Sequence, residues 1–132
     1  MEQTKDSTMI DPVHDMMGKW DYSKIIDPTF FGANESFELS YQMGMHFLKD
    51  CVTVEDWGCG SCYAKKYRVG KYKGIDGSPS KWTNTVCDLR YYKSKPDGIF
   101  MRHVLEHNLD WDKVLSNAID SFKKRFSIIF QV

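Results

Sequence analysis

Apolar and polar residues alternate along this chain with two different periods, which divide it into helices and strands. Residues 34–50 predict a helix, because apolar side chains recur at helical spacing and Asn34 or Ser36 would cap its start. Residues 110–126 predict a second helix with one apolar stripe and one polar face. The first stripe contains Phe37, Tyr41, Met45 and Leu48, and the second contains Trp111, Val114, Leu115, Ala118, Ile119 and Phe122. We expect both stripes to be buried, and we expect the polar face of the second helix, which includes Asn117, to be solvated.

Between and after these helices, short apolar runs predict β-strands. The runs are residues 51–57, 71–76, 85–89, 97–102 and 127–132, and residues 63–69 predict a short helix after the first strand. The last run is apolar at successive positions, which is typical of a strand buried on both faces. Strands that alternate with helices favour an α/β fold with a doubly wound, mostly parallel sheet and right-handed crossovers.

Residues 1–33 precede this pattern and predict an irregular N-terminal arm, whereas residues 34–132 form one domain. The arm is rich in aromatic residues, which are rarely free in water. We therefore expect it to pack over the domain, either as a cover of the core or as a lid over a ligand.

Charge and composition narrow the classes of function. Among 132 residues, Lys and Arg number 18 and Asp and Glu number 18, so the formal net charge is zero, which argues against a nucleic-acid partner. No apolar run approaches the roughly 18 residues that span a bilayer, and the start lacks the pattern of a signal peptide. We expect a cytoplasmic protein with no membrane partner, whose four cysteines are free thiols.

Candidate ligand-binding residues follow the strands one after another. In doubly wound sheets, ligands bind at the carboxyl ends of the strands. The first strand leads into Gly58-Cys59-Gly60, where glycines allow a tight turn and a close approach to a ligand. The second strand ends at Asp76, close to the spacing of about 20 positions at which an acid binds a ribose. Asp88 ends the third strand, where a carboxylate can accept from an exocyclic amine, and the fourth strand opens into His103.

Together these motifs resemble class I S-adenosylmethionine-dependent methyltransferases. The stretches VEDWGCGS, GIDGS, CDL and DGIFMRHVLEHNLDWDKVLSNA are similar to four successive motifs of that family. WDYSKIIDPTFFGANESF is similar to the upstream segment of some members that act on small molecules. The resemblance covers about residues 20–132. It implies a Rossmann-like sheet, S-adenosyl-L-methionine as cofactor and a small-molecule methyl acceptor.

The resemblance also implies roles for single residues. Gly58 and Gly60 would line the methionine part of the cofactor, and Asp56 would position that loop or accept from the cofactor's amino group. Asp76 would hold the ribose, Asp88 and Leu89 the adenine, and His103 would face the sulfonium or the substrate. The implied cofactor-binding residues are Asp56, Gly58, Cys59, Gly60, Asp76, Gly77, Asp88, Leu89 and His103; no metal ligands are implied. His103 and His107 are the candidate catalytic bases for an acceptor that carries a proton, although His107 can instead cap the following helix.

The sequence departs from the family pattern at three places. Cys62 stands where the family has a third glycine, and its side chain is expected to crowd the turn. The connection from residue 76 to residue 86 is short, so that the usual second helix is reduced to a turn. The chain ends in the fifth strand, before the usual antiparallel strands. We therefore expect a fragment or a truncated copy, or an edge that a second copy of the chain or the arm covers.

Other functions remain open at this point. A truncated module that binds the cofactor or pairs with another subunit, without transferring methyl groups, is the main alternative. A dinucleotide-dependent oxidoreductase shares the combination of glycines and acid. HVLEH matches a zinc-peptidase pattern, but a strand runs directly into it. Cys59 and Cys62 are either a redox pair or two packed thiols, and Trp82 either stacks on the adenine or seals the short connection.

Overall fold

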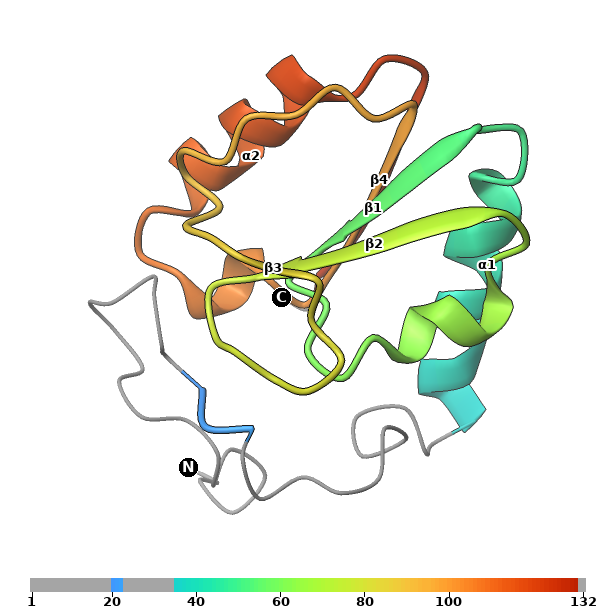
Figure 1. The fold of residues 1–132 in the computed structure, drawn as a ribbon, viewed down its shortest axis with the longest axis horizontal. Helices are drawn as coiled ribbons and strands as arrows, with labels where there is room; N and C mark the ends of the chain where they lie inside the picture. Colours follow the sequence, from blue (N-terminus) through green and yellow to red (C-terminus); the bar gives the residue numbers. More distant parts are fainter. Residues whose placement is uncertain (1–19, 23–34, 131–132) are drawn as a thin grey trace.

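The computed structural model describes residues 20–22 and 35–130, with side chains of the second range described from residue 38 onward. Figure 1 shows the helices and strands that these residues form. They are α1 (Glu35–Phe47), β1 (Thr53–Trp57), the 3₁₀ helix η3 (Tyr63–Tyr67), β2 (Lys71–Asp76), β3 (Thr85–Val86), β4 (Gly98–Arg102), the 3₁₀ helix η4 (Leu105–His107), α2 (Trp111–Ser121) and β5 (Arg125–Ile129).

The five strands run parallel in one sheet of order β3-β2-β1-β4-β5. The chain first builds outward from β1 to β3, and then returns to the other edge of β1 to add β4 and β5. The predicted Rossmann-like, doubly wound α/β fold is therefore confirmed. Because strand order reverses between β1 and β4, the carboxyl ends of these two strands flank the place where such sheets bind ligands.

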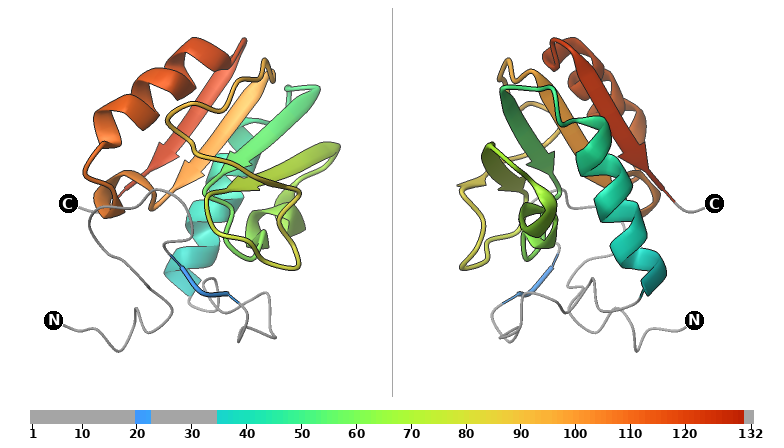
Figure 2. Two further views of the ribbon diagram at one scale, coloured as in Figure 1. Left: turned by 60° about the vertical axis from the view of Figure 1, so that its left-hand side comes forward. Right: turned by 90° about the vertical axis from the view of Figure 1, so that its right-hand side faces the viewer.

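Helices cover both faces of the sheet, with α1 on one side and α2 on the other (Figure 2). Successive side chains of a strand point to opposite faces, so β4 directs Phe100 towards α1 but Ile99 and Met101 towards α2. The α1 stripe is buried as predicted at Tyr41, Met45 and Leu48. The predicted caps Asn34 and Ser36 and the side chain of Phe37 lie outside the described residues.

The pattern predicted α2 only in part. The helix ends at Ser121, and the residues at 125 and 126, which were assigned to the helix, begin β5. Val114 and Ala118 are fully buried, but Trp111 and Ile119 are 50% and 53% exposed. The apolar stripe is thus wider than the surface that the sheet offers to the helix.

Asn117 was predicted to be solvated and is instead buried. Its side-chain amide donates to the carbonyl oxygens of Leu89, at 2.9 Å, and of Tyr92, at 2.8 Å. The segment between β3 and β4 packs on this side of α2, and its backbone carbonyls need donors once water is excluded. A polar residue on α2 provides them.

Two strand predictions were wrong, one in the extent of the strand and one in its burial. The third strand was expected over residues 85–89, but β3 has only two residues, because the chain turns away at Cys87 and Asp88. The last strand was expected to be buried on both faces, but every residue of β5 is only partly buried. β5 is an edge of the described sheet and pairs with β4 alone. The predicted short helix over residues 63–69 is the 3₁₀ helix η3.

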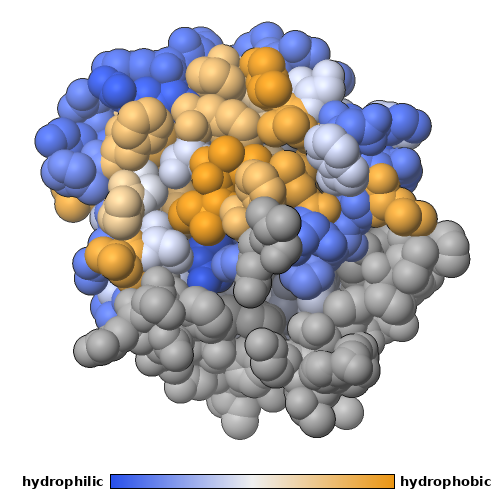
Figure 3. All heavy atoms as spheres, turned by 180° about the vertical axis from the view of Figure 1, so that it is seen from behind, coloured by the Kyte–Doolittle hydropathy of each residue, from blue (hydrophilic) through white to orange (hydrophobic). Residues whose placement is uncertain are grey.

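The side of the molecule opposite the view of Figure 1 carries a cluster of apolar side chains (Figure 3). Leu39, Met43 and Phe47 form an exposed stripe on α1, and Phe130, directly after β5, is also exposed. α1 and β5 are neighbours here, because the guanidinium of Arg125 lies 5.3 Å from the Phe47 ring centre. Within the described residues, no helix has the length and apolar character needed to cross a bilayer.

Candidate functional site

The loop after β1 passes through the left-handed backbone region three times. Gly58 has a φ of 80°, Gly60 of 55° and Cys62 of 59°. Glycine adopts this region freely, whereas any other residue is strained there by about 1–2 kcal/mol. A Cβ on Gly58 would also lie 2.3 Å from Cγ2 of Val104. The turn thus requires glycine at position 58. Cys62 has a backbone conformation that favours glycine, the residue expected at this position from the resemblance.

Asp76, at the end of β2, anchors this loop. Its Oδ2 accepts a hydrogen bond from the backbone N–H of Gly60, and its Oδ1 accepts one from the N–H of Ser78, each at 2.8 Å. Burial raises the pKa of Asp76 to about 6, and the backbone donors, including Gly77, oppose the rise. The predicted ribose-binding acid therefore touches both the predicted Gly60 and the predicted Gly77.

Asp56, on β1, is a second buried acid beside the loop. The hydroxyl of Tyr72 donates to its Oδ2 at 2.5 Å. Burial raises the pKa of Asp56 to about 7, the neighbouring Asp76 adds to the rise, and Tyr72 and Arg102 oppose it. The sequence pattern did not identify Tyr72, because a strand residue that reaches across to its neighbour leaves no local signal.

Arg102, the last residue of β4, brings a positive charge to the same edge of the sheet. Its Nε donates to the hydroxyl of Ser40 at 2.8 Å and its Nη1 to the hydroxyl of Tyr41 at 3.2 Å, both on α1. The guanidinium also lies 4.4 Å from the Tyr41 ring centre. Sequence reasoning missed Arg102, although a charged residue that ends a buried strand at the carboxyl edge was the available signal.

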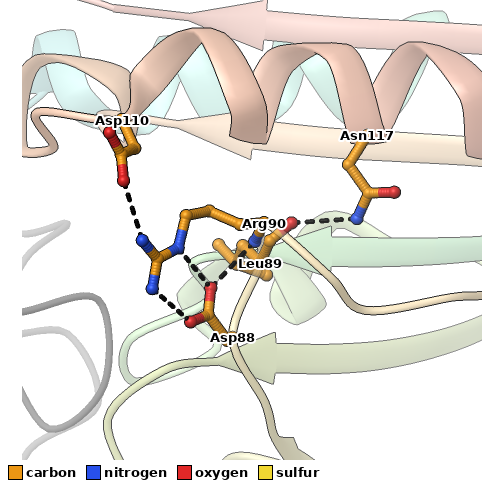
Figure 4. A network of polar contacts seen from close by, with 5 residues as sticks. All are labelled: Asp88, Leu89, Arg90, Asp110 and Asn117. Carbon is orange, nitrogen blue, oxygen red and sulfur yellow. Dashed lines mark hydrogen bonds and ion pairs between the residues drawn. The ribbon is translucent and has the colours of Figure 1, made fainter.

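Asp88 is held by an arginine, in contrast to the two buried acids (Figure 4). Its Oδ2 accepts from Nη2 of Arg90 at 2.8 Å, and its Oδ1 accepts from the Nε and the backbone N–H of the same residue. Arg90 also donates through Nη1 to Asp110, before α2, at 2.7 Å. The hydrogen bonds from Arg90 hold the pKa of Asp88 below its ordinary value. Arg90 was not predicted, because its second partner is 20 residues away in the sequence.

Leu89 follows Asp88 directly and packs beneath α2. Its side chain is buried in the apolar cluster beneath α2, and its carbonyl accepts from Asn117 (Figure 4). Both contacts hold the segment that carries Asp88, and the role of Leu89 in binding adenine stays a prediction.

His103 follows β4 with a φ of 56°, which is unusual for a residue other than glycine. Its backbone N–H donates to the carbonyl of Ile129 at 2.8 Å, which extends the pairing of β4 with β5. Its Nδ1 lies 2.5 Å from Oε2 of Glu106. The sequence placed Glu106 in the same motif as His103 but did not predict that the two side chains are paired.

His107 lies beside the described part of the arm. The Trp20 ring packs edge-on against the His107 ring, with centres 5.3 Å apart. The residue before α2 that serves as its N-cap is Asp110, so His107 does not hold the capping position.

Residues 20–22 cross the carboxyl edge of the sheet. The backbone N–H of Trp20 donates to the hydroxyl of Ser78 at 2.9 Å. Tyr22 is buried, and burial, followed by the nearby charges of Asp76 and Cys59, raises the pKa of its hydroxyl. This part of the arm packs over the domain, as expected, and it does so beside the acid that anchors the glycine loop. The rest of the predicted arm lies outside the described residues.

Comparisons with known proteins point to one group of structures. No family model matches the chain, and no curated protein matches it. The fold is similar to that of the plantazolicin methyltransferase BpumL in complex with SAH, with a TM-score of 0.50 and 15% identity over 64% of this chain. Two further BpumL structures, which hold desmethylPZN analogues and SAH, match at TM-scores of 0.48 and 0.47 with 16% and 19% identity over 66% and 77% of this chain.

The chain spans less than half of the similar proteins: 41%, 42% and 46% of their lengths. At this level of identity, the likeness shows the fold.

Proposed function

We propose that this chain binds S-adenosyl-L-methionine at the carboxyl ends of β1, β2 and β3 and transfers its methyl group to a small-molecule acceptor. The observation that supports this most is the hydrogen bond from the Gly60 backbone to Asp76. It joins a glycine turn to an acid at the end of the next strand, and this is the combination that binds a ribose and its neighbouring groups. BpumL, the methyltransferase with the similar fold, is bound to SAH.

The donors and acceptors at this edge fit the groups of the cofactor. An ionised carboxylate accepts about four hydrogen bonds, so Asp76 keeps capacity for a ribose hydroxyl beyond its backbone donors. Asp88, held ionised by Arg90, suits the amino group of adenine. Asp56 suits the ammonium of the methionine part, and Arg102 suits its carboxylate, because a guanidinium binds carboxylates through paired donors.

When bound, this cofactor supplies an electrophilic methyl group on its sulfonium. The chain's own residues then have two tasks: alignment, by the glycine turn and its anchor Asp76, and exclusion of water, by the buried side chain of Tyr22. The carboxylate of Glu106 at Nδ1 orients the His103 ring, and a histidine oriented by a carboxylate is a common general base. His103 is therefore the better candidate for a base, and His107 remains a candidate at the arm.

Calorimetry with S-adenosylmethionine, S-adenosylhomocysteine and NAD tests the cofactor. We expect the two adenosyl compounds to bind the wild type, NAD to bind poorly, and Asp76→Ala to lose at least about 100-fold in affinity for both adenosyl compounds. Asp120→Ala is the matched control, because it removes an exposed acid on α2. Failure of both adenosyl compounds to bind the wild type would contradict the proposal.

Release of S-adenosylhomocysteine in the presence of candidate acceptors tests the transfer itself. Small hydroxyl, amine and thiol compounds are the acceptors to compare, and His103→Ala should lower the rate with acceptors that must lose a proton. His103→Asn keeps a similar size and serves as the second variant.

A module that binds the cofactor but pairs with another subunit is the second candidate. The exposed stripe of α1 beside the half-buried edge strand β5 favours it, because contiguous apolar surface commonly marks an interaction site. Sedimentation velocity distinguishes the two. A monomer that releases S-adenosylhomocysteine supports the enzyme. The module is supported by a dimer that the Met43→Lys substitution dissociates and that releases no S-adenosylhomocysteine with any acceptor.

A further inference from the structure

Cys59 and Cys62 direct their sulfur atoms to one point above β2. A Cβ placed on Gly74 would lie 2.9 Å from Sγ of Cys59 and 2.6 Å from Sγ of Cys62. Position 74 therefore has no room for a side chain, and the two sulfurs fill the space that it leaves. The two sulfur atoms are therefore close neighbours, as the side-chain hydrogen bond between them also indicates.

The backbone between the two cysteines suits a bond between them. The N–H of Cys62 donates to the carbonyl of Cys59 at 2.8 Å, which closes a four-residue turn. Such a turn holds its end Cα atoms within about 7 Å, and disulfides need about 4.4–6.8 Å. Both cysteines are free thiols in the structure, as predicted, and they are 8% and 7% exposed.

The two thiols differ in their surroundings. The hydrogen bond between the two side chains lowers the pKa of Cys62 and raises that of Cys59. The Cys62 thiol also donates to the carbonyl oxygen of Trp82 at 3.3 Å, and the Cys59 sulfur lies 3.6 Å from the hydroxyl oxygen of Thr83. Cys62 is thus the more acidic thiol of the pair, and Cys59 lies beside it to complete a disulfide.

We propose that Cys59 and Cys62 form a reversible oxidation site that closes as a disulfide within the glycine-rich loop, with a small hydroperoxide as the oxidant. The Cys62 thiolate attacks one oxygen of the hydroperoxide. The O–O bond breaks, the other oxygen leaves as an alcohol or water after taking a proton, and Cys62 becomes a sulfenic acid. The Cys59 sulfur then attacks the Cys62 sulfur, the S–O bond breaks, and water leaves with the Cys59 proton. A dithiol reductant reverses the reaction by thiol–disulfide exchange.

The size of the oxidant follows from the burial of the pair. Hydrogen peroxide is little larger than water, and the small exposed fraction of both residues admits it more readily than a bulky disulfide. This site does not depend on the proposed methyl transfer, because it needs only the loop and Gly74. The disulfide would nevertheless form next to Gly60, whose backbone N–H donates to Asp76. We therefore expect oxidation to alter the ligand site.

The test oxidises the full chain with a small excess of hydrogen peroxide and measures the intact mass before and after dithiothreitol. Cys51, Cys59 and Cys62 all lie between Lys49 and Lys65, so trypsin leaves them in one peptide. The decisive sample is therefore the Cys51→Ala/Cys87→Ala variant, which keeps the pair and removes the other two cysteines. We expect it to lose two hydrogens on oxidation and to regain them on reduction.

Cys59→Ser and Cys62→Ser in that background should form no intramolecular disulfide. In the unoxidised double variant, limiting iodoacetamide at neutral pH should modify Cys62 faster than Cys59. A disulfide that needs Cys51 or Cys87, irreversible addition of oxygen without a disulfide, or faster alkylation of Cys59 would each overturn the proposal. Circular dichroism of each variant establishes that it is folded, and the double variant decides the outcome even where a serine variant does not fold.

Discussion

Asp76 ends β2 and Asp88 follows β3 by two residues, at the same edge of the sheet, but the two acids have opposite surroundings. Asp76 is buried, its partners are backbone amides, and burial raises its pKa. Asp88 is partly exposed, its partner is Arg90, and its pKa is lowered. The glycine-loop half of the site is therefore built by burial and backbone geometry, whereas the Asp88 half is built by an ion pair near solvent.

This difference determines how much each half of the site contributes to folding stability and to ligand binding. Buried groups that lose a partner are costly, because the remaining donors have no water to bind. Ion pairs near the surface contribute little to stability, because water competes for both charges. Changes in the glycine-loop half should thus alter stability and ligand binding together, and changes in the Asp88 half should alter binding with little effect on folding.

Asp76→Ala should give the largest effect. It leaves the N–H groups of Gly60 and Ser78 buried without their acceptor, and we expect the free energy of unfolding to fall by about 3 kcal/mol. Asp88→Ala is the matched change in the other half, with an expected loss of at most about 1 kcal/mol. Urea denaturation measures both. Equal losses for the two variants would contradict the contrast.

Gly58→Ala should destabilise the chain by about 2 kcal/mol, because a side chain is strained at its φ of 80° and would lie against Val104. Gly70→Ala is the control, since Gly70 also has a positive φ, of 114°, but is exposed. The difference between the two variants, measured by thermal unfolding, gives the contribution of the packed loop. If Gly70→Ala lowers the stability as much as Gly58→Ala does, then backbone strain alone explains the loss in Gly58→Ala.

The pH dependence of stability should separate the two halves. The pKa of Asp56 rises from 3.8 to about 7 in the folded chain, so between these values the folded state binds more protons than the unfolded state. The free energy of unfolding should therefore fall as pH rises from 5 to 8, by on the order of 1–3 kcal/mol, and Asp76 acts in the same direction up to about pH 6.

Asp56→Asn should remove much of this fall. Asp88→Asn should leave it intact, because the lowered pKa of Asp88 gives stability that is lost only when the pH falls below about 4. Urea denaturation at several pH values measures each profile. A profile for Asp56→Asn that matches the wild type between pH 5 and 8 would show that burial of this acid does not set the dependence.

Arg90→Met should have the smallest effect on folding, below about 1 kcal/mol, because Asp88 and Asp110 are 19% and 39% exposed. It should, however, raise the pKa of Asp88 towards its ordinary value. Carbon-13 NMR of the carboxyl groups reports that pKa directly, and Arg90→Lys tests whether charge alone suffices. An unchanged Asp88 pKa in Arg90→Met would show that Arg90 does not control this acid.

The sequence by itself determined the parallel α/β sheet, the bounds of β2, and the order of acids at the ends of β1, β2 and β3. These features are local: they depend on the period of apolar residues along one element, and on the residue types directly after each strand. The tight turn at Gly58 and Gly60 was predicted from the residue types, and the resemblance to the methyltransferase family marked Cys62 as the unusual residue of that turn.

The tertiary structure alone decided which groups meet. Arg90 reaches Asp110, Asn117 is buried against carbonyls of another segment, and the thiols of Cys59 and Cys62 converge over Gly74. These contacts depend on how far apart neighbouring elements pack and on which side of a strand or helix each residue falls. An apolar stripe cannot specify how much of itself a sheet will cover, which is why Trp111 and Ile119 remain exposed.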